Sequence, residues 1–207
     1  MTASLSLTRD RPIRKKRAAL LVIDVQNGTF GPKQAKECPQ FHAIASAHVI
    51  PNIRRLLAAF RGAGLEVIYT VMENLTDDGR DRSLDYKLSG ISIAKGSWEA
   101  KVVADIAPAR DEIVLPKTSS SVFNSTNLDY LLRNIGIEDV FVAGFLTDQC
   151  IDHAVKDGAD LGYFMSCVHD ACAAESEARH AAALECFKGY CRMISTDEVI
   201  RLALAAQ

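Results

Sequence analysis

The sequence predicts an α/β fold, a Rossmann-like three-layer sandwich with a central, mostly parallel sheet of six strands and helices on both faces. Short apolar runs alternate along the chain with segments whose apolar residues recur at helical spacing. The connections are short, and no internal repeat or low-complexity linker interrupts this alternation. We therefore expect a single domain over residues 1–207, of which residues 1–16 form a basic N-terminal arm.

The first half of the chain contains two expected strands and one long helix. Residues 18–25 (AALLVIDV) predict a buried strand, because the run is short, continuous and rich in branched side chains. Residues 43–62 carry apolar side chains at helical spacing, and the Gly-Ala-Gly at 62–64 ends that helix. Residues 65–72 (LEVIYTVM) predict the second strand. Residues 74–90 are polar and contain glycines, which favours a long loop or a partly helical lid.

The second half continues the alternation. A short helix is expected over residues 98–106, and residues 111–116 (DEIVLP) predict the third strand. Thr126 and Asp129 have the spacing of a capping box, with Asp in place of the usual Glu, before a helix that ends at Gly136. The remaining expected elements are a strand at 139–145, a helix capped by Thr147 and running to Asp160, a strand at 163–168, a helix at 175–187, a strand at 191–194 and a helix at 196–205.

Composition excludes several classes of protein. The 24 basic and 26 acidic residues give a net charge of −2, whereas a dedicated nucleic-acid binder needs a basic face. Apolar runs such as residues 18–23 are too short to span a membrane. The N-terminal residues lack the long apolar region of a signal peptide, so we expect a cytoplasmic protein. The basic stretch at 9–17 has no interleaved aromatic residue, which favours a solvated or oligomer-contacting arm.

Cysteine and histidine usage predicts neither a disulfide framework nor a metal site. The six cysteines form no CxxC pair, and with the histidines they show no zinc-finger spacing. A chain of this length builds its core without disulfides, so reduced thiols are expected. Four of the cysteines fall in expected strands or on an apolar helix face, which favours packing in the core: Cys167, Cys172, Cys186 and Cys191. The five histidines are scattered, and no metal or other cofactor is expected.

Three polar residues lie where predicted strands end. Asp24 ends the first strand, Lys117 follows the third and Cys150 follows the fourth. Parallel strands bring these ends to one edge of the sheet, where ligands bind in open α/β folds. Taken singly, a cap, a solvated lysine and a small buried cysteine are the commoner interpretations. Their joint position at one edge favours a catalytic group instead.

The three side chains suit nucleophilic catalysis. If Thr147 caps the helix, Cys150 lies in its first turn, where free N–H groups and the helix dipole favour a thiolate. Lys117 adds a positive charge, so a lowered pKa of the Cys150 thiol is expected. Asp24 can accept the thiol proton and return it to a leaving amine. A Cys150–His153 pair is an alternative dyad, because residues three apart on a helix are neighbours.

Three segments resemble the isochorismatase-like cysteine hydrolase family: LLVIDVQNGTF at 20–30, LPKTSSSVFNSTNLDYLLRNIG at 115–136 and VFVAGFLTDQCIDHAV at 140–155. VHDACAA at 168–174 matches more weakly, and the resemblance extends from Arg17 to Leu202. It implies the catalytic triad Asp24, Lys117 and Cys150. It also implies a cis peptide between Phe145 and Leu146 and an oxyanion hole formed by the N–H groups of Leu146 and Cys150. Gln149 departs from the small or aliphatic residue that the family more often has there.

The resemblance implies the reaction class. Family members that cleave a vinyl ether lack the cysteine, so Cys150 implies hydrolysis of a C–N bond in a small amide, carbamoyl or ureido compound through a cysteine thioester. Nicotinamidases carry metal-binding histidines after the second strand, whereas residues 72–85 contain none. The resemblance therefore implies a small-molecule substrate, no metal, and a homo-oligomeric enzyme, either a dimer or a tetramer.

Two other functions stay open at this point, a binding protein on the same fold and a thiol-redox protein. The redox alternative needs a resolving cysteine near Cys150, for which Cys172 is the sole possibility. For the enzyme, side chains around the predicted edge of the sheet are expected to bind substrate: Gln26, Phe30, Glu73, Asn74, Arg82, Tyr86 and Phe123.

Overall fold

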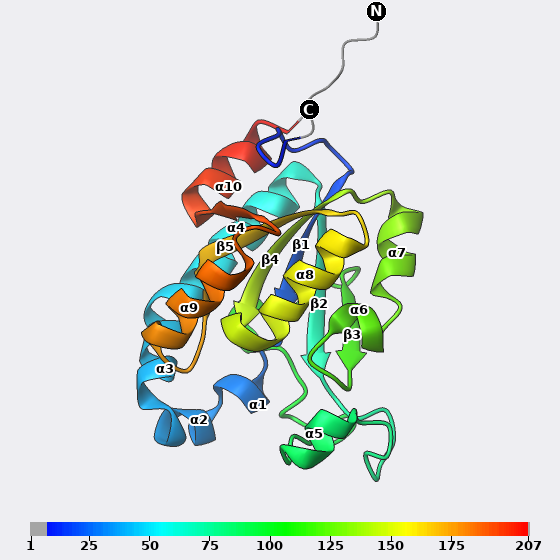
Figure 1. The fold of residues 1–207 in the computed structure, drawn as a ribbon, viewed down its shortest axis with the longest axis vertical. Helices are drawn as coiled ribbons and strands as arrows, with labels where there is room; N and C mark the ends of the chain where they lie inside the picture. The colour runs from blue at the N-terminus through cyan, green and yellow to red at the C-terminus, as the bar shows by residue number, and fades with distance from the viewer. Residues whose placement is uncertain (1–7, 207) are drawn as a thin grey trace, which may run out of the picture.

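The computed structural model describes residues 8–206 and has a six-stranded sheet in the order β3-β2-β1-β4-β5-β6. The strands are β1 (Ala18–Ile23), β2 (Glu66–Met72), β3 (Ile113–Lys117), β4 (Asp139–Phe145), β5 (Phe164–Ala173) and β6 (Arg192–Ile194). Every neighbouring pair is parallel, which confirms the predicted α/β sandwich. Figure 1 shows the strands pointing toward α1 (Asn27–Phe30), α2 (Pro32–Glu37) and α5 (Leu84–Leu88).

Helices cover both faces of the sheet, and each face has its own apolar core. The core on one face packs against α3 (Pro39–Ile44), the π-helical turn η1 (Ala45–Val49), α4 (Ile50–Ala63), the short η2 (Ala104–Ile106) and α10 (Thr196–Leu204). The core on the other face packs against α6 (Val122–Ser125), α7 (Leu128–Ile135), η3 (Thr147–Ile151), α8 (Asp152–Asp160) and α9 (Glu177–Phe187). Among residues 8–206, no helix is long and apolar enough to cross a bilayer.

Strand β1 lies in the middle of the sheet, and helices cover both of its faces. Its side chains alternate between the two cores: Leu20 and Val22 pack into one, and Leu21 and Ile23 into the other. A strand buried on both faces needs an uninterrupted apolar sequence. The apolar run at 18–23 therefore predicted this buried strand correctly. Its carboxyl end is flanked by β2 and β4, so Asp24 emerges between them.

Gly144 allows β4 to approach the end of β1. Its φ is 124°, and a Cβ built on it would lie 2.1 Å from the carbonyl oxygen of Ile23. We expect Gly144→Ala to lower the free energy of unfolding by roughly 2–4 kcal/mol, because backbone atoms cannot move aside cheaply. Chemical denaturation measures this change.

The matched control is Gly62→Ala, in helix α4. A Cβ there has no neighbour within 4 Å, and alanine favours helix, so stability should rise by about 0.5–1 kcal/mol. Equal effects of the two substitutions would contradict the close approach of β4 to β1.

The described part of the basic arm is bound to its own domain. Arg11 donates two hydrogen bonds of 2.7 Å to the carboxylate of Asp139, at the start of β4, and its guanidinium lies 3.5 Å from the centre of the Phe164 ring. Glu138 accepts a 3.1 Å hydrogen bond from Arg11 and also pairs with Arg14 and Arg17. Residues 9–17 are mostly exposed, as expected for a solvated segment, and acidic residues beside the start of β4 bind part of it. The rest of the arm, residues 1–7, lies outside the described residues.

Two local predictions in the second half of the chain were wrong. The segment at 98–106 consists mostly of turns and ends in the single short turn of η2. The capping box of Thr126 and Asp129 does not form. Asp129 instead pairs with Arg133 and accepts a 2.8 Å hydrogen bond from the hydroxyl of Tyr163, so tertiary partners outcompete the local cap.

The cysteines lie within residues 8–206, and all six are free thiols. Cys167, Cys172 and Cys191 are buried, as predicted from their positions in expected strands. Cys186 is exposed, however, because it lies on the solvent side of α9, whose buried residues are Ala183 and Phe187.

Candidate active site

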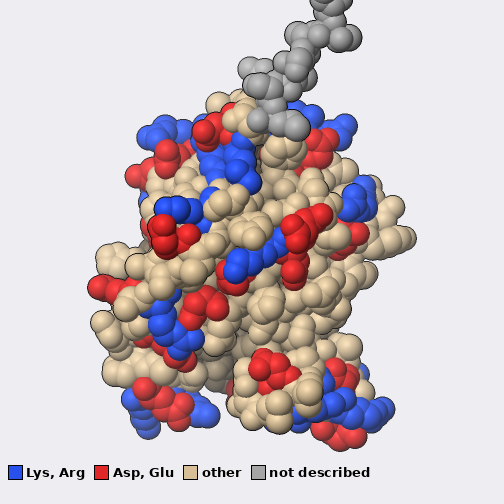
Figure 2. All heavy atoms as spheres, in the orientation of Figure 1, with Lys and Arg blue, Asp and Glu red and all other residues tan. Residues whose placement is uncertain are grey.

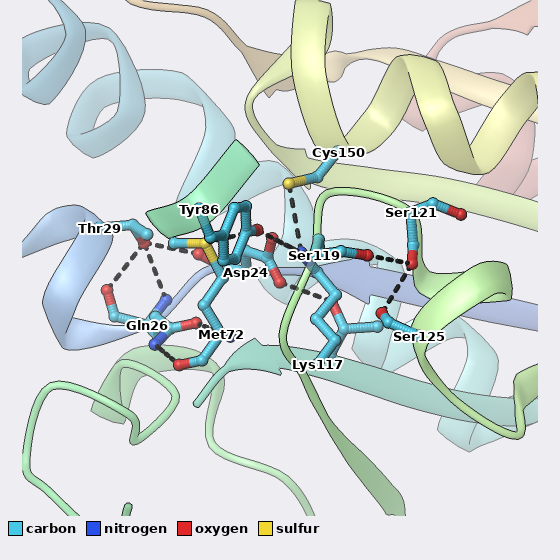
Figure 3. Close-up of polar contacts among 11 residues, drawn as sticks. Asp24, Gln26, Thr29, Met72, Tyr86, Lys117, Ser119, Ser121, Ser125 and Cys150 are labelled. Carbon is cyan, nitrogen blue, oxygen red and sulfur yellow. Dashed lines mark hydrogen bonds and ion pairs between the residues drawn. The ribbon is translucent and has the colours of Figure 1, made fainter. Parts of the chain in front are cut away.

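Asp24, Lys117 and Cys150 meet at the carboxyl edge of the sheet (Figure 3). The ammonium nitrogen of Lys117 lies 2.9 Å from Asp24 Oδ2 and 3.3 Å from Cys150 Sγ. The three side chains come from the ends of β1, β3 and the segment after β4, as the sequence predicts. Their exposed fractions are 1% for Asp24, 0% for Lys117 and 5% for Cys150. Charged groups this deeply buried require close partners. Here Lys117 contacts both Asp24 and Cys150.

Hydrogen bonds to strand β2 hold the backbone and one carboxylate oxygen of Asp24, and its other carboxylate oxygen accepts no hydrogen bond from the described residues. Its N–H donates to the carbonyl oxygen of Thr70 at 3.0 Å, and the Thr70 hydroxyl donates to Asp24 Oδ1 at 2.7 Å. The backbone turns sharply here with a φ of 56°, a left-handed conformation that aspartate tolerates better than most residues. Asp24 Oδ2 faces the Lys117 ammonium but accepts no well-aligned hydrogen bond from the described residues. That oxygen is therefore positioned to accept a proton.

Lys117 is held as an ammonium by several acceptors. It donates to the carbonyl oxygen of Ser119 at 2.8 Å and to the hydroxyl of Tyr86 at 3.2 Å. Burial alone lowers the pKa of Lys117, but the negative charge of Asp24 and the neighbouring Cys150 outweigh it and raise the pKa above its usual value. Lys117 is consequently a fixed positive charge between the other two side chains.

Cys150 lies on the short helical turn η3, which begins one residue earlier than expected. The cap is Leu146, and Thr147 is already inside the turn, where its hydroxyl contacts His180 Nδ1 at 2.8 Å. The peptide between Phe145 and Leu146 is cis, as the resemblance implies. The Leu146 N–H makes no hydrogen bond to any of residues 8–206. Leu146 also lines the cavity that contains Cys150.

The pKa of the Cys150 thiol is raised to about 12, which overturns the expected decrease. Burial is the largest cause, and the charge of Asp24 adds to it, while Lys117 opposes both. The sequence predicted a thiolate at the start of a helix. The Lys117 ammonium, which Asp24 also contacts, does not offset the rise in the thiol pKa caused by nearly complete burial. The resting thiol therefore keeps its proton, and attack requires a base.

Replacing Lys117 by methionine should slow alkylation of Cys150 by iodoacetamide about tenfold or more at a fixed alkaline pH. The substitution keeps most of the side-chain volume but removes the charge that lowers the thiol pKa, and it leaves Asp24 unopposed. Mass spectrometry of the Cys150 peptide measures the rate. Lys188→Met, at an exposed lysine, is the control. An unchanged rate in a folded Lys117→Met variant would show that the ammonium does not act on the sulfur.

A cavity of about 360 Å³ opens above these three residues, large enough for a small molecule. It lies between α1–α3 on one side and α5 with its following loop on the other, and Figure 2 shows the hollow between these two lobes. Its walls are mainly apolar, with a few polar groups and charged residues. The lining includes Asp24, Thr29, Lys33, Gln34, Cys38, Phe41, Met72, Tyr86, Ile91, Ser92, Ile93, Phe145, Leu146, Gln149, Cys150 and Glu175.

Tyr86 is the one residue of the seven expected to bind substrate that lines this cavity. It projects from α5, is 2% exposed, and places its hydroxyl 3.2 Å from both Lys117 Nζ and Met72 Sδ. Burial raises the pKa of Tyr86, so the hydroxyl remains protonated. A segment predicted to be a loop or partly helical lid thus contacts Lys117 directly.

The other six side chains lie elsewhere, which corrects their expected role. Gln26 binds the backbone of Met72 and Glu99. Its Oε1 accepts a hydrogen bond from the Met72 N–H at 2.6 Å, and its Nε2 donates to the carbonyl oxygens of Met72 and Glu99. Phe30 stacks on His42 with ring centres 4.4 Å apart, and Phe123 stacks on Tyr163.

The three polar residues that remain among the six bind the loop itself. Glu73 accepts from the Gly96 N–H at 2.7 Å, and Asn74 donates to Ser92 Oγ at 3.1 Å. Arg82 donates to the carbonyl oxygens of Gly79 and Ile91, both at 2.9 Å. Backbone N–H and C=O groups in a long loop need hydrogen-bond partners, and Glu73 and Arg82 supply some of them. Side chains engaged in this way do not line the cavity.

Sequence reasoning missed the wall contributed by α2 and α3. Pro32 and Pro39 stand at the first turns of these helices, a position that proline favours, and each could have signalled a helix start. Of the other predicted partners of Cys150, His153 is exposed and does not line the cavity. Cys172 directs its sulfur toward the carbonyl oxygen of Val142, 3.8 Å away, and lies outside the cavity wall.

The fold and this edge of the sheet define a class of protein: a parallel α/β sandwich in which a buried ammonium lies between a carboxylate and a thiol. Residues 18–198 match the isochorismatase domain model, and the chain belongs to that family. Ureidoacrylate amidohydrolase RutB of Pantoea ananatis is 33% identical in an alignment 174 residues long, which covers 75% of this chain and 69% of that relative. The corresponding protein of Serratia proteamaculans is also 33% identical, over 74% of this chain and 68% of its own.

Solved structures agree with this assignment. A cysteine hydrolase from Pseudomonas syringae superposes with a TM-score of 0.85 at 26% identity, covering 95% of this chain and 97% of its own. N-carbamoylsarcosine amidase from Thermoplasma acidophilum superposes with a TM-score of 0.72 at 26% identity, covering 88% of this chain and 98% of its own.

Proposed function

We propose that this protein hydrolyses a C–N bond of a small amide, carbamoyl or ureido compound through a thioester on Cys150. The observation that carries the proposal is the contact of Lys117 with both Asp24 and Cys150 at the base of a small cavity. The names of the similar proteins, ureidoacrylate amidohydrolase and N-carbamoylsarcosine amidase, support this class of substrate.

The first half of the reaction acylates the enzyme. Asp24 Oδ2 accepts the thiol proton while Cys150 Sγ attacks the carbonyl carbon and forms the C–S bond. The N–H groups of Leu146 and Cys150 stabilise the resulting oxyanion. When the carbonyl re-forms, the C–N bond breaks and the proton on Asp24 passes to the departing amine. Lys117 holds the carboxylate and the sulfur at fixed positions throughout.

The second half releases the acid. A water molecule takes the place of the amine, Asp24 accepts one of its protons, and the hydroxide adds to the thioester carbon. Collapse of this intermediate breaks the C–S bond, and the proton on Asp24 returns to the sulfur. The raised pKa of the Cys150 thiol favours the return of the proton to the sulfur, which restores the resting thiol.

Ammonia release from a panel of amides, carbamates and ureido acids tests the proposal. At least one member of the panel should be turned over by the wild-type protein, with an equal amount of the carboxylic acid from an amide or of CO₂ from a carbamate or ureido acid. A panel without any turnover, combined with tight reversible binding of the same compounds, would favour a binding protein instead.

Chelation should leave activity unchanged. Residues 8–206 contain no group of three or more histidine, cysteine or acidic side chains arranged to hold a metal ion. Dialysis against EDTA followed by the ammonia assay is the measurement, with a zinc amidase as the positive control. Activity that EDTA removes and a divalent ion restores would contradict the metal-free mechanism.

We further propose a single-domain, cytoplasmic homo-oligomer. The free thiols support a reducing compartment. Three large apolar side chains lie exposed, two of them on α5, and their exposure supports a self-association surface: Leu84 at 72%, Leu88 at 79% and Trp98 at 53%. Light scattering after size exclusion measures the oligomeric state, and a monomer at all concentrations would contradict self-association.

A further inference from the structure

The turn η3, which carries Cys150, is bound to the first turn of helix α9 by two side-chain contacts. Arg179 Nε donates a hydrogen bond of 2.5 Å to Asp148 Oδ2. The next residue of α9 is His180, and its Nδ1 lies 2.8 Å from the hydroxyl oxygen of Thr147. Two consecutive residues of α9 thus bind two consecutive residues at the start of η3.

The contact between His180 and Thr147 is the buried one of the two. Thr147 is 0% exposed, and within residues 8–206 its hydroxyl makes no other hydrogen bond. The Arg179 side chain is 42% exposed, and exposed ion pairs contribute little stability. A buried hydroxyl without its partner is costly, because its desolvation is not offset by a hydrogen bond. The His180 contact is therefore the stronger constraint on the position of η3.

His180 is the acceptor in this hydrogen bond. Its pKa is lowered, chiefly by burial and also by the neighbouring His169, whereas Asp148 raises it. The imidazole is therefore neutral at pH 7, and one of its ring nitrogens can accept a hydrogen bond. Because the Thr147 hydroxyl has no other acceptor among the described residues, it donates to Nδ1, and the ring proton lies on Nε2.

The start of η3 has no side-chain cap of its own. The residue at the cap position is Leu146, whose side chain cannot accept a hydrogen bond. The Leu146 carbonyl oxygen accepts hydrogen bonds from the N–H groups of Gln149 and Ile151, at 3.1 and 3.2 Å, so the backbone of the turn is anchored at this residue. Thr147 follows directly, and its bond to His180 fixes the first residue of η3 against α9.

We infer that His180 is a positioning residue: by binding Thr147 it keeps the start of η3, and with it the proposed oxyanion hole, in place. The inference rests on the proposed function, because it takes the N–H groups of Leu146 and Cys150 as the donors to the oxyanion. Reactions at the sulfur that place an oxygen in this hole should depend on His180, whereas reactions without such an oxygen should not.

Two reagents for Cys150 separate these cases without requiring turnover. Isobutyraldehyde forms a reversible hemithioacetal: the sulfur bonds to the carbonyl carbon, the thiol proton passes to the carbonyl oxygen, and no group leaves. That oxygen can accept hydrogen bonds from the oxyanion hole. Methyl methanethiosulfonate has no carbonyl group: the sulfur forms an S–S bond, and methanesulfinate leaves together with the thiol proton. Mass spectrometry of the Cys150 peptide gives the thiosulfonate rate, and the slowing of that rate by the aldehyde gives the Kd of the aldehyde.

His180→Leu should raise the Kd of the aldehyde roughly tenfold and leave the thiosulfonate rate within about twofold of the wild-type rate. The second result is expected because burial, Asp24 and Lys117 are the main influences on the pKa of Cys150. His180→Asn, which keeps an acceptor close to the position of Nδ1, should restore most of the affinity for the aldehyde. His48→Leu is the matched control and should change neither value, since His48 lines the same cavity of about 660 Å³ as His180 but makes no hydrogen bond to η3.

Thr147→Val tests the same hydrogen bond from its other end, because valine keeps the volume of threonine and lacks the hydroxyl. If this bond positions η3, Thr147→Val, His180→Leu and the double variant weaken aldehyde binding to the same extent. An unchanged Kd in either single variant, additive effects in the double variant, or an equal slowing of the thiosulfonate reaction would overturn the inference. A wild-type protein that does not bind the aldehyde would overturn it too. Failure of the proposed function appears separately, as an absence of ammonia release from the panel of amides while the aldehyde still binds.

Discussion

Replacing Cys150 by alanine should abolish amide hydrolysis, with a loss of roughly 10⁴-fold or more, while the fold persists. The sulfur is the atom that forms the covalent intermediate, and no neighbouring group in the described structure can take over that bond while keeping the contact with Lys117. Cys150→Ser should be inactive too, because a hydroxyl is a much weaker acid than a thiol. Initial rates of ammonia release measure the loss, and circular dichroism checks the fold.

Cys186→Ala is the matched control, since Cys186 is exposed on α9 and outside the cavity. It should hydrolyse amides at the wild-type rate. Turnover by Cys150→Ala at a comparable rate would end the covalent mechanism. The thiol of Cys38, which also lines the cavity, would then be the next nucleophile to test.

Asp24→Asn should lower hydrolysis by roughly 10²- to 10⁴-fold and at the same time speed alkylation of the thiol. The carboxylate is the base in the proposed reaction, so its loss removes the acceptor of the thiol proton. Its negative charge also raises the pKa of Cys150, so its loss lowers that pKa and exposes more thiolate at a given pH. The two rates should therefore change in opposite directions, which simple damage to the site does not produce.

Asp129→Asn provides a control for this pair of measurements, because Asp129 pairs with Arg133 away from the cavity. Neither of its rates should change. Normal hydrolysis by Asp24→Asn would place the base elsewhere. Slower alkylation would mean that the carboxylate promotes ionisation of the thiol rather than opposing it.

The parallel sheet and the position of the three catalytic candidates could be predicted from the sequence. Buried parallel strands appear as continuous apolar runs, and their polar ends at Asp24, Lys117 and Cys150 converge wherever the sheet is parallel. The reaction class predicted from these residues agrees with the amidohydrolase and amidase names of similar proteins.

The walls of the cavity could not be predicted in the same way. Side chains such as Arg82 and Gln26 looked available because they follow strands, but each is occupied by backbone carbonyl groups that sequence does not reveal. Gln34 went unnoticed because α2 is a short helix with no buried residue and no apolar stripe. Which polar side chains remain unpartnered depends on tertiary packing, and local sequence carries little of that information.

The pKa of Cys150 shows a similar limit. Sequence supplies the charges near the thiol but not the depth at which it is buried, and burial is the largest influence on this group. The sign of the shift is therefore opposite to the expectation. Because the pKa of Cys150 is raised rather than lowered, the thiol keeps its proton at rest and needs a base when it attacks. Asp24 is that base in the proposed reaction.

Competition between water and hydroxylamine tests the thioester mechanism most directly. A series of substrates that share one acyl group and differ in the leaving amine is hydrolysed in the presence of a fixed concentration of hydroxylamine. If all of them pass through the same thioester on Cys150, the ratio of hydroxamate to acid is identical across the series, whatever the amine. A ratio that varies with the leaving amine would contradict a common covalent intermediate and, with it, the role assigned to Cys150.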